Sequence, residues 1–261
     1  MTQTQILPPS RPLEPRPRAI LVGASSGIGA ALARKLAREG WLVAALARRE
    51  EALRQLCDSI NAEAGETRAL PFGHDVTDFS SVPGTFQTAV QALGGLDLVA
   101  YLAAYQPRVA LEEFDFEKDR HMIEVNLLGG MAWLDEASVR FQRAGAGHIV
   151  GVSSIAGERG RVANPAYGTS KAALATYLEA LRNRLSRHGV TVTTMKLGFV
   201  DTELLKNAAR VMWVISADRA AEGIYEAIRL RKQMVYLPAR WRLVSLVIRS
   251  IPSFIFRRVS L

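Results

Sequence analysis

A serine, a tyrosine and a lysine lie close together in the segment 154–171, and their side chains could move a proton. Tyr167 follows Ser154 by thirteen residues, and Lys171 follows Tyr167 by four. A separation of four residues places Tyr167 and Lys171 on one face of a helix. Because an ammonium group favours a neighbouring phenolate, we expect Lys171 to lower the pKa of Tyr167 from its ordinary value of about 10 towards neutrality. Such a phenol could act as a general acid or base.

The composition predicts one globular domain that contains no metal site. The chain has 261 residues, of which 49% are hydrophobic, and Cys57 is its single cysteine. A chain of this length can bury a sizeable core, and one cysteine excludes an internal disulfide and a multi-cysteine zinc site. The four histidines are scattered without ligand spacing, so we expect no metal. These features fit a reducing, cytoplasmic setting.

Apolar runs alternate with amphipathic patterns along the chain, and this alternation indicates an α/β fold. Strands are expected at 19–23, 41–47, 68–74, 96–102, 148–152, 190–197 and 234–237, and helices at 28–39, 50–64, 79–93, 119–143, 165–188 and 218–231. Repeated βαβ units with almost wholly apolar strands predict a doubly wound parallel sheet of about seven strands with helices on both faces. We assign this domain to residues 19–239. A Pro/Arg-rich arm without the apolar core of a signal peptide precedes it at 1–18.

A glycine-rich turn joins the first strand to the first helix and has the features of a phosphate-binding loop. Gly23, Gly27 and Gly29 have the spacing GxxxGxG. Glycines let the backbone approach a pyrophosphate, and the helix that follows presents free N–H groups to the anion. We therefore predict a Rossmann-like dinucleotide site whose loop residues are Gly23, Ser25, Ser26, Gly27, Ile28 and Gly29. The same residues match a hydrolase nucleophile elbow, but that elbow does not follow a first strand, so we reject it.

Two arginines at the end of the second strand bear on the choice of cofactor. Arg48 and Arg49 stand where an acidic residue would bind the ribose 2′-hydroxyl of NAD. An arginine suits a 2′-phosphate instead, because its planar fork binds phosphate oxygens. We therefore expect NADP(H) rather than NAD(H). In the alternative interpretation, Arg48 and Arg49 only begin a solvated helix.

These pieces together resemble the short-chain dehydrogenases/reductases from residue 19 onwards. The matching segments are GASSGIG at 23–29, Asp75 with Val76, Asn126 in VNLLG, the serine pair at 153–154, YGTSK at 167–171 and LGFVDT at 197–202. The resemblance departs where the family's usual NNAG reads YLAA at 101–104 and where the usual PG reads Leu197-Gly198. All four catalytic positions of the family are present.

The resemblance implies a role for each catalytic residue. Tyr167 would protonate the ketone oxygen, and Lys171 would lower the pKa of Tyr167 and bind the nicotinamide ribose. Ser154 would polarise the carbonyl, and Asn126 would hold a water in a proton relay with Lys171. The resemblance also implies cofactor contacts from Asp75 and Val76 to the adenine, from Val200 and Thr202 to the nicotinamide amide, and from the small surface of Ala103.

The C-terminal half has a narrower resemblance, which concerns the substrate. AGERGR at 156–161, GFVDT at 198–202 and the segment 234–261 resemble the bacterial decaprenylphosphoryl-2-keto-erythro-pentose reductases. In that subgroup a partner flavoprotein oxidase makes the ketone on a lipid-linked sugar, and the reductase completes cell-envelope sugar epimerisation. The N-terminal half looks more like a general carbonyl or 3-oxoacyl reductase. A non-catalytic NADP-binding regulator is a third hypothesis, which the complete catalytic set argues against.

A basic amphipathic tail is expected at 240–261. It holds five arginines and no acidic residue, within a chain whose net charge is +8. Arg242, Ser245 and Arg249 fall on one stripe of an otherwise apolar helix that is too short to span a bilayer. The tail could lie peripherally on the inner face of the cytoplasmic membrane or pack on a neighbouring subunit. We expect no nucleic-acid partner, because no such motif is present. The family resemblance implies a homodimer or homotetramer paired through the helices at 119–143 and 165–188.

Overall fold

The computed structural model describes residues 16–207 and 211–258, and its centre is one parallel sheet. The strands of this sheet are β1 (Arg18–Val22), β2 (Leu42–Ala47), β3 (Ala69–Gly73), β4 (Leu98–Tyr101), β5 (Gly147–Ser154), β6 (Val190–Leu197) and β9 (Met234–Leu237). Their order is β3-β2-β1-β4-β5-β6-β9, and every neighbouring pair is parallel. The prediction of a seven-stranded, doubly wound α/β sheet is confirmed.

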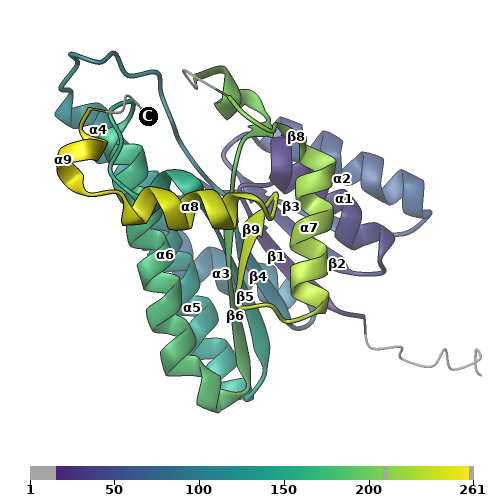
Figure 1. Cartoon of the computed structure of the whole chain (residues 1–261). Coiled ribbons are helices and arrows are strands. Elements are labelled where there is room, and N and C mark those ends of the chain that lie inside the picture. The colour runs from purple at the N-terminus through teal and green to yellow at the C-terminus, as the bar shows by residue number, and fades with distance from the viewer. Residues whose placement is uncertain (1–15, 208–210, 259–261) are drawn as a thin grey trace, which may run out of the picture.

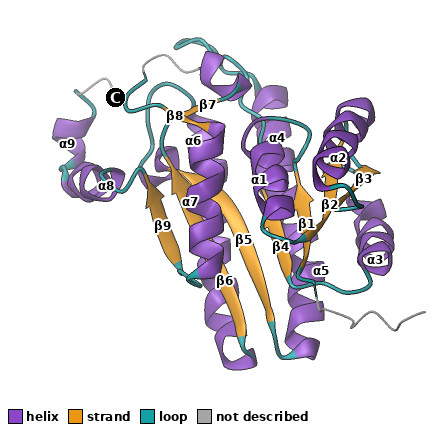
Figure 2. Cartoon of the chain, turned by 90° about the vertical axis from the view of Figure 1, so that its right-hand side faces the viewer, coloured by secondary structure: helices purple, strands orange, loops and turns teal. Residues whose placement is uncertain are grey.

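Helices cover both faces of the sheet, as Figure 2 shows. The helices α1 (Gly27–Arg38), α2 (Glu50–Ala64) and α7 (Ala217–Arg229) pack on one face, and α3 (Val82–Leu93), α5 (Gly129–Ala144) and α6 (Pro165–Leu185) pack on the other. Each face of the sheet has its own hydrophobic core. In β1, Ala19 and Leu21 pack in the core under α1, α2 and α7, whereas Ile20 and Val22 pack in the core under α3, α5 and α6. Because successive side chains of a strand point to opposite faces, a strand covered on both sides is apolar throughout.

The chain reverses its direction across the sheet between β1 and β4. It passes from β1 outwards to β3, and then returns to β4 on the other side of β1. In open α/β sheets, ligands bind at such a switch point, outside the carboxyl ends of the strands. The loops that follow β1, β4 and β5 meet at this edge of the sheet and form the candidate site (Figure 1).

The helix expected at 119–143 is interrupted. The structure contains α4 (Phe116–Ile123), a π-helical turn (Glu124–Leu128) and then α5. A short parallel pair, β7 (Val200–Asp201) with β8 (Ile215–Ser216), was also not predicted. Apolar periodicity does not register a single-turn π-bulge or a two-residue strand, whereas the remaining helices and strands lie close to their predicted positions.

The segment expected as a tail packs on the domain. It forms α8 (Trp241–Ser250) and α9 (Ser253–Phe256), and residues 259–261 lie outside the described residues. Ser245, which was expected on a polar stripe, is buried with Trp241 and Ile248 on the inner side of α8. The outer side of α8 carries three exposed apolar side chains, those of Leu243, Leu246 and Val247.

At the other end of the chain, residues 1–15 of the expected arm lie outside the described residues. The strand β1 already begins at Arg18, and Arg16 forms an ion pair with Glu66 at 2.9 Å. Across residues 16–207 and 211–258, none of the helices combines the length and the apolar character that crossing a membrane requires.

Candidate active site

A cavity of about 1400 Å³ opens along the carboxyl edge of the sheet, from the glycine-rich turn to α8. It exceeds the usual size of a site for one drug-sized ligand, so it has room for a dinucleotide and a substrate together. Every residue predicted to bind a cofactor lines it: Gly23, Ser25, Ser26, Gly27, Ile28, Gly29, Arg48, Arg49, Asp75, Val76, Ala103, Tyr167, Lys171, Val200 and Thr202. Ser154 also lines the cavity, whereas Asn126 does not.

The glycines of the first turn are required by close backbone contacts. Gly23 has a φ of +96°, and a Cβ atom there would lie 2.5 Å from the backbone nitrogen of Ala103. A Cβ on Gly29 would overlap the carbonyl oxygen of Gly23. Ser26 is the N-cap of α1, and its side chain makes no capping hydrogen bond. The N–H groups of the first helical turn therefore remain available to an anion, which is the arrangement that a pyrophosphate needs.

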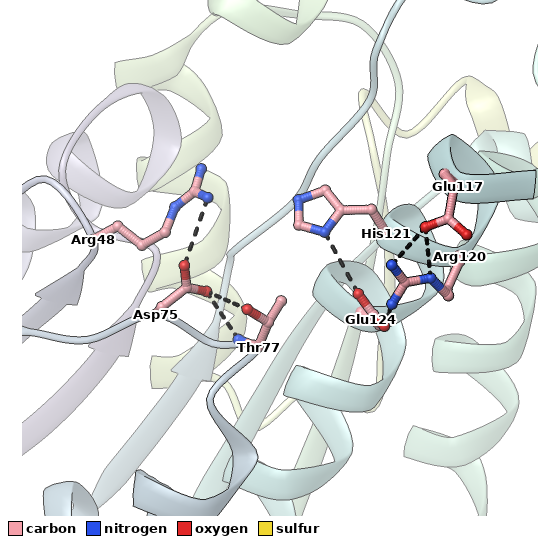
Figure 3. A network of polar contacts seen from close by, with 7 residues as sticks. All are labelled: Arg48, Asp75, Thr77, Glu117, Arg120, His121 and Glu124. Carbon is pink, nitrogen blue, oxygen red and sulfur yellow. Dashed lines mark hydrogen bonds and ion pairs between the residues drawn. The ribbon is translucent and has the colours of Figure 1, made fainter. Parts of the chain in front are cut away.

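Arg48 and Arg49 differ in their partners. Arg49 Nη2 donates to Ser25 Oγ at 3.0 Å and to Ser26 Oγ at 2.6 Å, which holds its guanidinium over the glycine-rich turn. Arg48 Nη1 forms an ion pair with Asp75 Oδ2 at 3.6 Å, and Figure 3 draws this pair. Burial raises the pKa of Asp75, but hydrogen bonds from Thr77 and the charge of Arg48 outweigh burial and leave this pKa below its ordinary value. The charge of Arg48 is thus shared with a carboxylate.

Tyr167 lies in the first turn of α6, where the sequence Asn164-Pro165 begins the helix. Asn164 Oδ1 accepts a hydrogen bond from the backbone N–H of Tyr167 at 3.0 Å, and proline suits the first helical position because it lacks an N–H. Ser154 ends β5, and its Oγ accepts from the N–H of Ala156 at 3.1 Å. The end of one strand and the start of one helix therefore bring the serine and the tyrosine to the same cavity.

The pKa values of Tyr167 and Lys171 differ from the expectation. Burial raises the pKa of Tyr167 to about 12, and the nearby Ser154 hydroxyl offsets only part of this effect. Burial also lowers the pKa of Lys171 to about 8. Lys171 Nζ donates to the carbonyl oxygen of Val152 at 3.0 Å and lies 5.8 Å from the centre of the Tyr167 ring. The expected fall of the Tyr167 pKa is therefore wrong for this structure, because burial of the phenol is the largest influence on this pKa and raises it.

Asn126 lies behind the cavity wall, in the π-helical turn. Its Oδ1 accepts from the N–H of Tyr105 at 2.6 Å, and its Nδ2 donates to the Tyr105 carbonyl oxygen and to Ser170 Oγ, both at 3.0 Å. The amide thus joins the loop after β4 to α6. Arg120 bonds to Glu124 at 2.5 Å at the start of this turn (Figure 3). The water relay through Asn126 stays a prediction.

The sequence did not predict the part of the cavity wall that α8 forms. Trp241, Val244 and Ile248 of α8 line the cavity. Arg159 holds α8 in place, since its Nη1 donates to the carbonyl oxygens of Ile248, at 2.7 Å, and of Ile251. The Arg159 guanidinium also lies 4.0 Å from the centre of the Phe256 ring. The two arginines of GERGR stand out in the sequence, but nothing near them indicates that Arg159 bonds to residues of α8 far along the chain.

Comparison with known proteins agrees with this geometry. The family model described as short chain dehydrogenase matches residues 17–212. An uncharacterized oxidoreductase of Myxococcus xanthus is 38% identical over 71% of this chain and 73% of its own length. The ketoacyl reductase HetN of a Nostoc species is 28% identical over 80% of this chain and 74% of its own. A variant of actinorhodin polyketide ketoreductase, solved with NADPH, has a TM-score of 0.77 and 25% identity, over 85% of this chain and 95% of that one.

Proposed function

Because this chain belongs to the short chain dehydrogenase family, we propose that it is an NADPH-dependent reductase that converts a ketone to a secondary alcohol. One observation carries this proposal: Ser154, Tyr167 and Lys171 line the same cavity as a glycine-rich turn of the kind that binds a pyrophosphate. Ketone reduction is favoured further by the similarity to a ketoacyl reductase and to a polyketide ketoreductase.

The residues along the cavity suit an NADP molecule. The close backbone of the Gly23–Gly29 turn would receive the pyrophosphate, and Arg48 with Arg49 would bind the 2′-phosphate. Asp75 and Val76 would contact the adenine, and Ala103, Val200 and Thr202 would contact the nicotinamide end. NADPH, when bound, supplies a hydride for the carbonyl carbon of the substrate.

The hydroxyl groups of Tyr167 and Ser154 stabilise the charge that develops on the ketone oxygen. A phenol whose pKa is about 12 is protonated at neutral pH, so Tyr167 can donate its proton to the forming alkoxide. Ser154 donates a hydrogen bond to the same oxygen. Burial lowers the pKa of Lys171 to about 8, so its ammonium group can give up a proton near neutral pH. In the proposed mechanism, Lys171 returns a proton to Tyr167 and binds the nicotinamide ribose. In the proposed relay, Asn126 holds the water that connects Lys171 to solvent.

The finer proposal for the substrate is a polyprenyl-phosphate-linked 2-ketofuranose made by a partner flavoprotein oxidase. The observation that favours it is the surface of α8 and α9. Leu243, Leu246 and Val247 on α8, and Phe254 and Ile255 on α9, are exposed beside several exposed arginines. Such a surface fits peripheral contact with an anionic membrane, where a polyprenyl substrate resides. A general carbonyl or 3-oxoacyl reductase is the alternative.

A ketone panel tests these functions. Purified protein receives NADPH and small ketones, 3-oxoacyl thioesters or a lipid-linked 2-keto sugar, and NADPH oxidation is followed by absorbance. We expect turnover of at least one class. Binding of NADPH without oxidation by any ketone would favour the non-catalytic regulator. Turnover of 3-oxoacyl or small ketones but not of the lipid-linked sugar would reject the finer proposal alone.

A Tyr167→Phe variant tests the proposed acid. It keeps the ring in the cavity and removes the hydroxyl, so the variant should bind NADPH like the wild type. Its kcat should fall by about 100-fold or more, because general acid catalysis contributes about that factor. A Tyr177→Phe variant, in which the altered hydroxyl bonds to Asp135 on the helical surface, serves as the control. Retained reduction by Tyr167→Phe would exclude Tyr167 as the proton donor.

A further inference from the structure

Arg161 is a charged residue in the cavity wall to which the proposed reaction gives no role. Its Nη2 donates to the carbonyl oxygen of Ile155 at 3.2 Å, and its Nε is buried without any hydrogen-bond partner. Burial lowers the pKa of this guanidinium, and the charge of Glu158 opposes that effect. Because a guanidinium keeps its charge in proteins, Arg161 brings a positive charge and unused N–H donors to the cavity.

Glu158 is already bound by other groups. Lys196 Nζ lies 2.6 Å from Glu158 Oε1, and the Tyr236 hydroxyl donates to the same oxygen at 3.1 Å. Arg249 lies 3.6 Å from the other carboxylate oxygen. Among the ion pairs that the described residues form, none includes Arg161. The positive groups around Glu158 therefore outnumber this single carboxylate.

The acidic residues of the cavity itself do not neutralise Arg161 either. Within the described part of the chain, the cavity is lined by two acids, Asp75 and Glu203. Asp75 pairs with Arg48, and Glu203 pairs with Lys206 at 2.7 Å. Arg161 is half-buried, and its charge has no ion-pair partner among the described residues, so an anionic ligand would offset the free energy that this partial desolvation costs.

The position of Arg161 associates it with the substrate. It belongs to the loop between Ser154 and Tyr167, and its acceptor Ile155 directly follows Ser154. The arginines assigned to the 2′-phosphate follow β2, which β1 and β4 separate from β5 in the sheet. Arg161 therefore lies at the end of the cavity where the carbonyl is reduced, and not at the end where Arg48 and Arg49 receive the cofactor.

We propose that Arg161 binds an anionic group of the ketone, a carboxylate or a phosphate, and that the enzyme thereby selects acidic ketones. This inference rests on the proposed ketone reduction. A guanidinium can bind two oxygens of either anion at once, which fixes orientation as well as charge. A free phosphorylated or carboxylated ketone and the phosphodiester of a lipid-linked one share this chemistry.

The experiment compares matched probes for binding to the full chain. The protein is first saturated with NADP⁺, because the oxidised cofactor cannot reduce a ketone. It is then titrated in a calorimeter with 4-oxo-4-phenylbutanoate or with the methyl ester of this acid. A second arm uses dihydroxyacetone phosphate and dihydroxyacetone. We expect at least one anion to bind about 10-fold or more tightly than its neutral partner, since hydrogen bonds to charged groups contribute about that factor. The pair of probes with the larger ratio of affinities shows whether the site prefers a carboxylate or a phosphate. A lipid-linked phosphodiester ketone, titrated in the same way, then shows whether the phosphate can belong to a lipid rather than to a free ketone.

Variants assign the preference to Arg161. Arg161→Gln should abolish the preference for the anion, and Arg161→Lys should keep part of it, because a point charge remains. Arg187→Gln removes an exposed arginine that neither lines the cavity nor lies on α8 or α9, and it should behave like the wild type. Three outcomes would overturn the proposal. In the first, the acid binds no more tightly than its ester and dihydroxyacetone phosphate binds no more tightly than dihydroxyacetone. In the second, no probe binds at millimolar concentration, and in the third, Arg161→Gln keeps the preference for the anion unchanged.

Turnover separates this inference from the function on which it rests. The kcat/KM ratio for the acid and the ester is measured with NADPH in the same variants. Failure to oxidise NADPH with any ketone would contradict the proposed reductase, whatever the calorimeter shows. Reduction of both ketones with no preference for the acid would contradict only the role of Arg161.

Discussion

At the scale of single residues, burial acts on Tyr167 and Lys171 in opposite directions. It raises the pKa of the phenol and lowers that of the amine, so each side chain is held towards its uncharged form. The sequence indicated a lysine that lowers the pKa of a tyrosine, whereas in the structure burial raises the pKa of Tyr167 and Lys171 is bonded to the Val152 carbonyl. A protonated phenol is the form that can donate a proton to a ketone oxygen.

The lowered pKa of Lys171 predicts how stability depends on pH. Between about 8 and 10.5 the unfolded chain holds a proton on Lys171 that the folded chain has lost. The contribution of Lys171 to stability therefore rises across this range and is lost as the pH falls through 8. We expect the wild type to gain free energy of unfolding relative to Lys171→Met by up to about 1.4 kcal/mol per pH unit.

Urea unfolding of both proteins from neutral pH to about pH 10 measures this difference. Lys232→Met, which alters an exposed lysine, should run parallel to the wild type. If the curve of Lys171→Met also runs parallel to that of the wild type, the pKa of Lys171 is not lowered in the folded state.

The two arginines after β2 should differ in their effect on cofactor choice. Arg49 is bonded to serine hydroxyls, whereas Arg48 shares its charge with Asp75. We expect Arg49→Ala to lower the preference for NADPH over NADH by about tenfold or more, and Arg48→Ala to lower it less. The Kd values of both cofactors, measured by fluorescence, check this order. Equal weakening of NADPH and NADH binding would exclude a 2′-phosphate contact.

At the scale of elements, one part of the cavity wall depends on α8. The inner side of this helix contributes Trp241, Val244 and Ile248 to the cavity wall, and Arg159 bonds to the carbonyls at its end. The positive guanidinium there suits the negative end of the helix dipole. Deleting α8 would remove part of the cavity wall as well as the exposed side of the helix. Membrane binding by the exposed side therefore has to be tested with substitutions that leave the inner side unchanged.

The exposed side of α8 predicts peripheral membrane binding. We expect the full chain to float with vesicles of phosphatidylglycerol and phosphatidylcholine, and to float less with phosphatidylcholine alone or in high salt. Replacing Leu243, Leu246 and Val247 together with glutamine should weaken vesicle binding by about tenfold or more, since their burial in lipid is lost.

Leu230→Gln, which alters an exposed leucine outside α8, is the control and should float like the wild type. Flotation of the triple variant equal to that of the wild type would exclude α8 as the contact. A triple variant that floats normally but sediments as a smaller assembly would instead assign this surface to a neighbouring subunit.

At the scale of the whole molecule, the elements with strong local signals were predictable. Strands covered on both faces are apolar throughout, and Gly23 and Gly29 are required by the backbone, so the sheet and the phosphate loop can be read from neighbouring residues. The contact of Arg159 with Ile248 joins residues far apart in the chain, and no periodicity records it. The pKa of Tyr167 depends on burial by the completed fold, which the spacing to Lys171 does not reveal.

The long helices predict association of whole molecules. We expect a homodimer or homotetramer, paired through α5 and α6, and the exposed side chains of Leu128, directly before α5, and Val139, on α5, fit such a contact. Sedimentation should give a mass that is two or four times 28.6 kDa, and Val139→Arg should shift it towards one chain. A single-chain mass at all concentrations would contradict this assembly.

The position of α8 in the chain has an evolutionary consequence. Residues 17–212, which the family model matches, contain the glycine-rich turn and Tyr167, whereas α8, which lines another part of the same cavity, follows them. Mutations in α8 can therefore reshape what enters the cavity while the inherited redox chemistry stays intact. Selection for a new ketone could act on one short helix, and homologues with the same reaction would then diverge first in this segment.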